Sequence, residues 1–176
     1  MVPLLLKSAA AIAAVAGLAF ASADELAPGA AYGDAALSSL TQAELADHAL
    51  RVFERADRNG DQALDVDEYT ALSVVTAELA QLNGFIAIET EDEPSLIALP
   101  GASPSALSRS EHIRINAVAQ HAFYAYAGGD GRIDADEFVA AQSALFIAAD
   151  RNGNGTLKRR ELGVFAQRQA SQTIGA

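Results

Sequence analysis

The sequence predicts an all-α fold, in which helices are joined by short acidic turns. Apolar residues recur at helical spacing in five stretches between residues 41 and 170. Clusters of Asp, Asn and Gly separate these stretches at residues 57–61, 128–131 and 150–155. Away from these turns, only residues 85–88 have the composition of a short strand. We therefore expect one helical domain over residues 41–170.

Residues 1–23 precede this domain and are almost wholly apolar. They combine Lys7, a short alanine-rich stretch and a small-x-small ending at Ala21-Ser22-Ala23, the pattern of a secretory signal peptide. We expect cleavage after Ala23. The apolar run from Ser8 to Ala23 is shorter than the roughly 20 residues that a membrane-spanning helix needs, so an uncleaved anchor is the less favoured alternative.

The remaining chain is strongly acidic and lacks cysteine. Without Lys7 it carries 11 basic and 23 acidic side chains, a charge that repels nucleic acid and anionic membranes and attracts cations. The absence of cysteine excludes disulfides, thiol catalysis and thiolate metal sites. With the signal peptide, these features predict a periplasmic or secreted protein that needs a source of stability other than disulfides.

The first two helices follow a flexible leader. Residues 24–40 are rich in Ala, Gly and Ser with little periodicity, and are expected to be mobile. Thr41 and Glu44 form a capping-box pattern that begins a helix, which ends at Asp57. A second helix is expected from Val66, with apolar residues at helical spacing.

An irregular insert over residues 83–110 separates these helices from three more. Its prolines forbid a long helix. Helical spacing then resumes from Ser110, and two further helices are expected over residues 136–149 and 159–168.

The last turn carries a specific motif. Residues 150–161 read Asp-Arg-Asn-Gly-Asn-Gly-Thr-Leu-Lys-Arg-Arg-Glu and match the pattern D-x-[DN]-x-[DN]-G-x₅-E at every specified position. Ca²⁺ binds six to eight oxygen atoms, and glycine at position 6 permits the left-handed backbone of the tight turn. This loop and its flanking helices resemble the EF-hand family of calcium-binding proteins. Residues 57–68 form a second copy of the motif.

The resemblance implies the ligand set. Side-chain oxygens serve at loop positions 1, 3, 5 and 12, a backbone carbonyl at position 7, and position 9 contributes directly or through water. The implied ligands are Asp57, Asn59, Asp61, the Ala63 carbonyl, Asp65 and Glu68 in one loop, and Asp150, Asn152, Asn154, the Thr156 carbonyl and Glu161 in the other.

Two departures from the family pattern distinguish the loops. Gln62 stands where glycine is expected, so it must adopt a positive φ at a cost of about 1–2 kcal/mol. A third loop, residues 126–137, has Tyr126 at position 1 and Gly128 at position 3, which offer no carboxylate. Asp130, Asp134 and Glu137 keep the second half of its pattern, and we expect this degenerate loop to be empty.

The resemblance also implies short β-bridges between paired loops, formed around an apolar residue at position 8, which is Leu64, Ile133 or Leu157 here. Numbered in chain order, the first loop is residues 57–68, the second 126–137 and the third 150–161. The helix over residues 138–149 is shared by the second and third loops, so these are expected at its opposite ends. The first loop should therefore pair with one of them, and the sequence leaves open which one.

These features predict calcium binding in an exported protein, with a structural or buffering role. The alternative is a calcium-responsive switch that exposes an apolar groove to a partner protein. An enzyme with accessory calcium sites is a third hypothesis, but no catalytic constellation is recognisable in the sequence. His48, His112 and His121 share no metal-ligand spacing and are expected at the surface or at helix ends.

Overall fold

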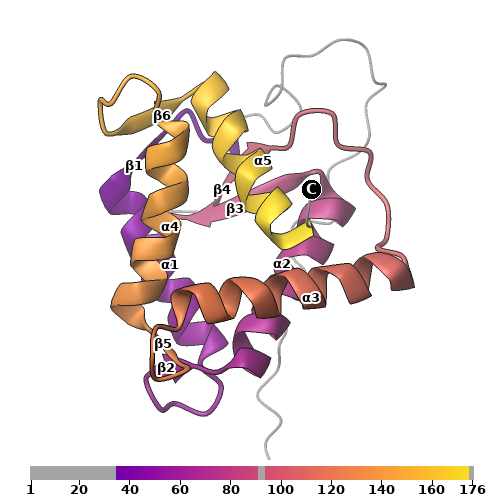
Figure 1. Ribbon diagram of the computed structural model, residues 1–176. Coiled ribbons are helices and arrows are strands. Elements are labelled where there is room, and N and C mark those ends of the chain that lie inside the picture. The colour runs from indigo at the N-terminus through magenta and orange to yellow at the C-terminus, as the bar shows by residue number, and fades with distance from the viewer. Residues whose placement is uncertain (1–34, 91–93, 175–176) are drawn as a thin grey trace, which may run out of the picture.

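A computed structural model of the protein describes residues 35–90 and 94–174. These residues form five helices and three two-stranded antiparallel sheets, so the fold is mixed and the all-α prediction was too narrow. The elements are β1 (Ser39–Thr41), α1 (Gln42–Ala56), β2 (Ala63–Leu64), α2 (Val66–Asn83), β3 (Phe85–Glu89), β4 (Pro94–Ala98), α3 (Arg109–Tyr126), β5 (Ile133–Asp134), α4 (Ala135–Ala149), β6 (Thr156–Lys158) and α5 (Arg160–Ile174). Figure 1 shows their arrangement.

The helices begin where local side chains satisfy their first amides. At α1 the Thr41 hydroxyl accepts from the Glu44 amide, and the Glu44 carboxylate accepts from the Thr41 amide, which completes the predicted capping box. The same reciprocal arrangement begins α2, α3 and α4, whose N-cap residues are Asp65, Ser108 and Asp134. These caps satisfy amides that a helix leaves unpaired, which is why the helix starts lie close to their predicted positions.

The acidic loops lie at opposite ends of two antiparallel helices. Loop one (residues 57–68) connects α1 to α2, loop two (126–137) connects α3 to α4, and loop three (150–161) connects α4 to α5. Loops one and two pair through β2 and β5, which resolves the alternative that the sequence left open. They lie at the lower end of α1 and α4 in Figure 1, and loop three lies at the upper end.

Loop three pairs with a segment that does not belong to any loop. Leu40 of β1 lies opposite Leu157 of β6, and both side chains are completely buried. Ser39 and Leu40 belong to the segment expected to be a mobile leader, and that expectation was wrong for these residues. Their pairing with β6 satisfies backbone groups that loop three would otherwise expose.

The lower and upper ends of the molecule each have a hydrophobic core of their own beneath the loops. The lower core contains Phe53, Phe123 and Phe138 with Leu64 and Ile133 from the paired loops. The upper core is built around two phenylalanines, the paired leucines Leu40 and Leu157, and side chains of β3 and β4. Its buried members are Leu40, Leu45, Ala80, Ile86, Ile88, Ile97, Leu145, Phe146, Ala149, Leu157, Leu162, Phe165 and Ala166. The position-8 residues anchor the loops because burial of their side chains holds the loop backbone against the helices.

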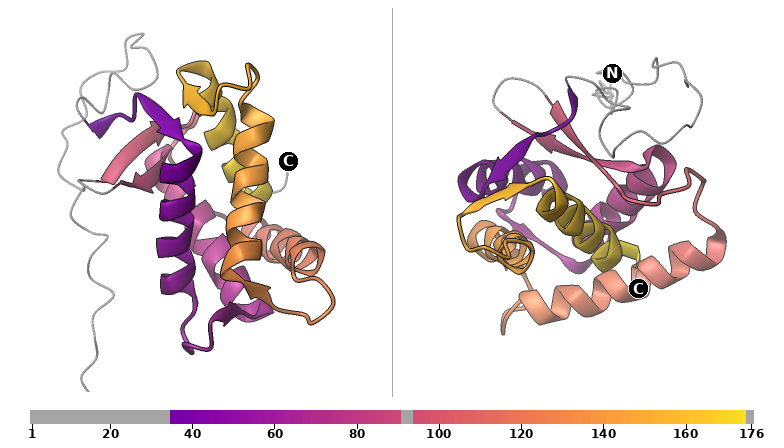
Figure 2. Two further views of the ribbon diagram at one scale, coloured as in Figure 1. Left: turned by 90° about the vertical axis from the view of Figure 1, so that its left-hand side faces the viewer. Right: turned by 90° about the horizontal axis from the view of Figure 1, so that it is seen from above.

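The insert is more regular than its prolines suggested. β3 and β4 form an antiparallel hairpin, which packs beside α5 and α2 (Figure 2). Arg51 and Arg55 of α1 both form ion pairs with Glu89 at the end of β3, so the hairpin is tied to the helix that enters loop one.

The predicted signal peptide, residues 1–23, and most of the predicted leader lie outside the described residues. Within residues 35–90 and 94–174, no helix has the length and apolar character needed to cross a membrane.

Candidate metal centre

Loop one is organised around the carboxylate of Asp57. Its Oδ1 accepts hydrogen bonds from the amides of Gly60 (2.8 Å) and Asp61 (3.2 Å), and its Oδ2 accepts from the amide of Gln62 (2.9 Å). The side-chain oxygen of Asn59 accepts from the Asp61 amide at 2.8 Å. These bonds wrap the backbone around the first acid, so the turn is held by the side chains at positions 1 and 3.

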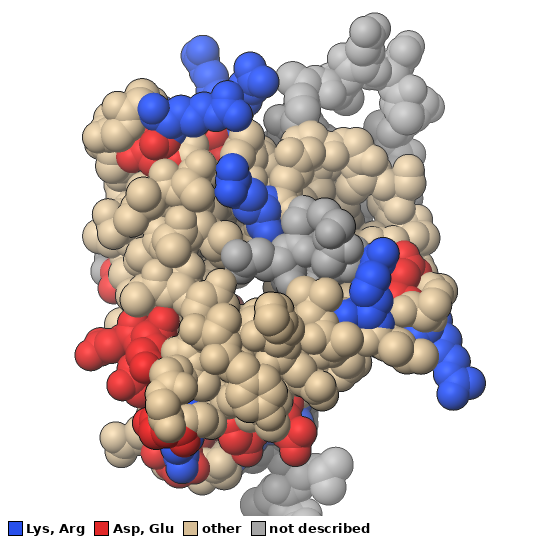
Figure 3. All heavy atoms as spheres, viewed as in Figure 1, with Lys and Arg blue, Asp and Glu red and all other residues tan. Residues whose placement is uncertain are grey.

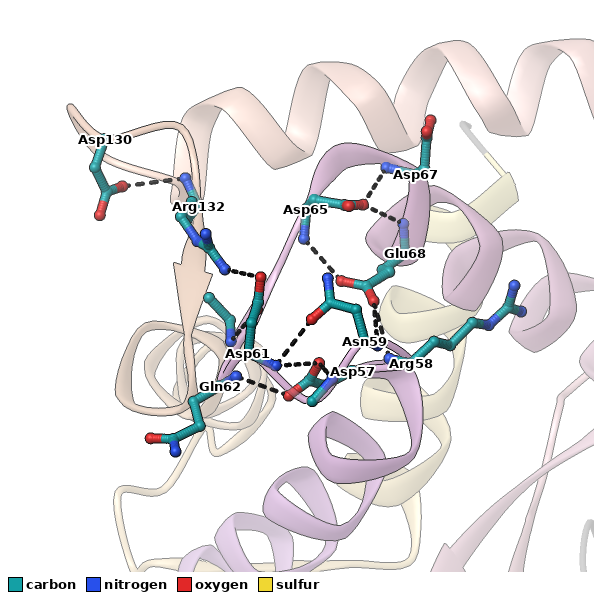
Figure 4. Close-up of polar contacts among 12 residues, drawn as sticks. Asp57, Arg58, Asn59, Asp61, Gln62, Asp65, Asp67, Glu68, Asp130 and Arg132 are labelled. Carbon is teal, nitrogen blue, oxygen red and sulfur yellow. Dashed lines mark hydrogen bonds and ion pairs between the residues drawn. The ribbon is translucent and has the colours of Figure 1, made fainter.

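Glu68 closes the loop from the first turn of α2. Its Oε1 accepts from the amides of Arg58 (2.9 Å) and Asn59 (3.3 Å), and its Oε2 accepts from the Asp65 amide (3.1 Å). Only 7% of Glu68 is exposed, although it is a carboxylate. Figure 4 shows its carboxylate directed back over the turn that contains Asp57 and Asn59. The acid at position 12 therefore contacts the backbone at positions 2 and 3 and closes the loop.

Loop three repeats this arrangement with a different sequence. Asp150 accepts from the amides of Gly153 (2.9 Å) and Asn154 (3.3 Å) through Oδ1, and from Gly155 (2.9 Å) through Oδ2. The side-chain oxygen of Asn152 accepts from the Asn154 amide at 3.0 Å. The closing acid Glu161 accepts from the side-chain amide of Asn152 at 2.9 Å, so it also reaches back to position 3.

Position 6 has the same backbone conformation in both loops. Gly155 has a φ of 73°, and Gln62 has a φ of 66°, as its position in the motif predicts. Side chains with a Cβ rarely adopt this conformation because the Cβ crowds the following carbonyl. Gln62 is exposed, and the turn is held by the hydrogen bond from its own amide to Asp57. The loop geometry is therefore strong enough to impose strain on residue 62.

Loop two keeps only the second half of this arrangement. Asp134 and Glu137 bond reciprocally as the cap of α4. Tyr126 at position 1 is partly buried and packs against the lower core, and Gly128 at position 3 has no side chain. Positions 1 and 3 of loop two thus supply neither the carboxylate nor the amide oxygen that organises loops one and three, although Asp130 at position 5 accepts from the Arg132 amide.

The structure also places a cation beside loop one that the sequence pattern did not single out. Nη2 of Arg132 in loop two lies 2.5 Å from Oδ2 of Asp61. The hydrogen bond from Arg132 holds the pKa of Asp61 below its usual range. The only signal for this contact in the sequence is a basic residue at position 7 of a loop that turns out to pair with loop one.

The two intact loops differ sharply in charge. Loop one contains five acids and one base, whereas loop three contains two acids and four bases. Figure 3 shows red side chains gathered over the lower end of the molecule and blue side chains over the upper end. Electrostatic attraction should therefore concentrate cations at loop one more than at loop three.

The donor set fits Ca²⁺, although the side chains are not converged on one point. Among the described residues, no three Asp, Glu, His or Cys side chains are grouped so as to hold a metal ion. In both loops the acids instead accept hydrogen bonds from loop amides, as described above. The loops present the carboxylate, amide and carbonyl oxygens that a hard cation such as Ca²⁺ prefers, and they contain none of the Cys or His residues typical of zinc and copper sites. Metal binding would require the acids of each loop to turn from these amides toward one point.

His48 does not join either loop, and it is not the surface residue that the sequence suggested. It lies within α1, and 7% of it is exposed. Its Nδ1 accepts from the Glu89 amide at 3.1 Å, and burial lowers the pKa of His48 to about 4. The imidazole also lines a cavity of about 70 Å³ between the helices, beside Gln142 and Tyr69. His48 is therefore a neutral core residue.

Comparisons with protein-family models, with curated proteins and with solved structures find no match for this chain. The functional interpretation therefore depends on the geometry of the loops and on the resemblance of their sequences to the EF-hand pattern.

Proposed function

We propose that the protein is exported and binds Ca²⁺ through loops one and three, with a structural or buffering role. One observation carries this proposal. Two loops of different sequence and opposite charge adopt the same arrangement, with the first acid holding the position-6 amide and the last acid directed back to position 3. A fold that needed only two tight turns would not require Gln62 to adopt the conformation of Gly155.

The residues of each loop would form an oxygen cage once their side chains turn from the loop amides toward the ion. A bound Ca²⁺ would supply positive charge to carboxylates that now accept hydrogen bonds mainly from loop amides, with Asp61 also paired to Arg132. Asp57, Asp61 and Glu68, with Asp65 directly or through water, would hold the ion in loop one, and Asp150 and Glu161 would hold it in loop three. The Asn and backbone carbonyl oxygens complete the six to eight ligands that Ca²⁺ prefers.

Calorimetric titration with CaCl₂ tests the ligand assignment. The wild-type chain should bind two ions, and Glu68→Gln and Glu161→Gln should each lose one of them, because each substitution replaces a bidentate carboxylate with an amide. Asp67→Asn is a matched control, since it removes an exposed acid of loop one that is not an implied ligand. If both glutamate variants still bind two ions, the assignment is wrong.

Thermal unfolding tests the structural role. Binding confined to the folded state stabilises it by about 2.7 kcal/mol per site at a hundredfold excess over Kd. For a chain of this size this corresponds to a Tm rise of roughly 5–10 °C. MgCl₂ at the same concentration should have no such effect, because Mg²⁺ demands a smaller octahedral site. Superimposable melting curves with and without calcium would count against the proposal.

A calcium-responsive switch is the second candidate. It is favoured by an apolar stripe on α2, where Val75, Leu79 and Leu82 expose 46%, 36% and 45% of their surface at helical spacing. A switch should change the fluorescence of a dye that binds apolar surface when calcium is added. An unchanged signal would leave the structural role as the better explanation.

A further inference from the structure

An arginine side chain from loop two lies against an acid of loop one, with which loop two is paired. The guanidinium of Arg132 contacts Oδ2 of Asp61, while Oδ1 of Asp61 accepts from the Ala63 amide at 3.2 Å. Both oxygens of the position-5 acid are therefore engaged before any metal arrives. Figure 4 shows Arg132 reaching across from loop two to this carboxylate.

The fold holds Arg132 in this position. β2 and β5 pair with Leu64 opposite Ile133, and these two side chains are 0% and 1% exposed. Arg132 immediately precedes Ile133, and its amide is bound by the Asp130 carboxylate at 3.1 Å. The backbone of Arg132 is thus fixed against loop one, and only the Arg132 side chain is left to move.

We propose that Arg132 competes with Ca²⁺ for Asp61 and thereby lowers the affinity of loop one, an inference that rests on the calcium-binding function proposed above. A divalent ion bound by Asp61 must either displace the guanidinium or lie close to a like charge. The Arg132 and Asp61 side chains are 44% and 41% exposed, so the ion pair is weak enough to be displaced. The degenerate loop two acquires a role in this way: it tunes its neighbour without binding a metal.

Loop three provides an internal comparison. Its position-5 residue, Asn154, is uncharged and forms no ion pair. Loop three pairs through β6 with β1, whose residues Ser39, Leu40 and Thr41 carry no positive charge. A cation supplied by the paired segment is therefore specific to loop one, where the strong negative charge would otherwise favour tight binding.

Titration of loop one alone tests the proposal. In the full chain carrying Glu161→Gln, which removes the closing acid of loop three, Arg132→Gln should tighten CaCl₂ binding by roughly two- to tenfold. Arg132→Lys keeps the charge and should change the affinity less than Arg132→Gln. Arg58→Gln is the matched control, because Arg58 lies in loop one with its side chain directed away from the acids (Figure 4). Its effect should be smaller than that of Arg132→Gln.

The outcomes separate this inference from the function on which it rests. If the Glu161→Gln parent binds one Ca²⁺ and Arg132→Gln binds it no more tightly, or no more tightly than Arg58→Gln does, the competition is refuted and the calcium site stands. If neither the parent nor Arg132→Gln takes up Ca²⁺, the proposed function itself fails. As a second measurement, the side-chain Nε–H resonance of Arg132 should shift during the CaCl₂ titration, and an unchanged resonance in a chain that binds calcium would also overturn the proposal.

Discussion

The strained conformation of Gln62 allows a quantitative test of the loop geometry. Gln62 and Gly155 occupy the same position of loops one and three with φ values of 66° and 73°. A residue with a Cβ costs about 1–2 kcal/mol in this region. Glycine avoids that cost but loses about 0.4–1 kcal/mol more backbone entropy on folding. Gln62→Gly should therefore stabilise the protein by about 1 kcal/mol, and Gly155→Gln should destabilise it by a similar amount.

The surroundings of both residues allow these two substitutions to report on backbone conformation with little change in packing. Gln62 is exposed, and a Cβ added to Gly155 would meet no atom within 4 Å, so neither change should add or remove much packing. Gly129 is the control, because it has an ordinary φ and equal space around it. There the entropy effect acts alone, and Gly129→Ala should be slightly stabilising.

Urea denaturation without added calcium measures these effects. With an m-value of about 2 kcal/mol/M, a change of 1 kcal/mol moves the midpoint by roughly 0.5 M. The midpoint should rise for Gln62→Gly and fall for Gly155→Gln. A midpoint that falls for Gln62→Gly would mean that the glutamine is not strained, and the argument from shared loop geometry would lose its main support.

Two further predictions concern the core. Leu40→Ala should lower the free energy of unfolding by about 2–5 kcal/mol, because Leu40 is completely buried against loop three. Leu50→Ala is the control and should lower it far less, because the Leu50 side chain is 40% exposed. Equal urea midpoints for these two variants would contradict the pairing of β1 with β6. Burial lowers the pKa of His48 from 6.5 to about 4. Between pH 6.5 and about 4 the unfolded chain therefore binds a proton at His48 that the folded chain does not bind. The free energy of unfolding should fall by roughly 3 kcal/mol as the pH drops through this window. His48→Asn retains an acceptor for the Glu89 amide without a titrating ring, so its stability should depend less steeply on pH; identical pH profiles would refute the burial argument.

The parts of the fold that the sequence predicted well are those that depend on neighbouring residues. Thr41 with Glu44 begins α1 because both partners of the cap lie within one turn. The loop positions were recognisable for the same reason, since twelve consecutive residues contain the acids, the amides that they bind and the bend between them. Even the strain at Gln62 followed from its place in this local pattern.

The features that the sequence did not predict depend on residues far apart in the chain. Nothing near Leu40 indicates that it will lie opposite Leu157, because an isolated leucine in a segment rich in small residues carries no periodic signal. The same holds for Arg132, whose contact with Asp61 exists only because loops one and two pair. His48 was taken for a surface residue because its neighbours, such as the Glu89 amide of β3 and Gln142 of α4, come from distant parts of the chain.

The way in which the loops pair bears on how the two proposed sites would behave together. In this chain each intact loop pairs with a segment that lacks a complete set of ligands: loop one with loop two, and loop three with β1. The intact loops are separated by the 15 residues of α4, about 22 Å of helix, and each covers a different core. Within the described residues no β-bridge pairs one intact loop with the other, so an ion bound in one loop does not order the other by direct strand pairing. We therefore expect two independent binding events with a Hill coefficient near 1, which suits a protein stabilised by calcium better than one that switches over a narrow range of calcium concentration.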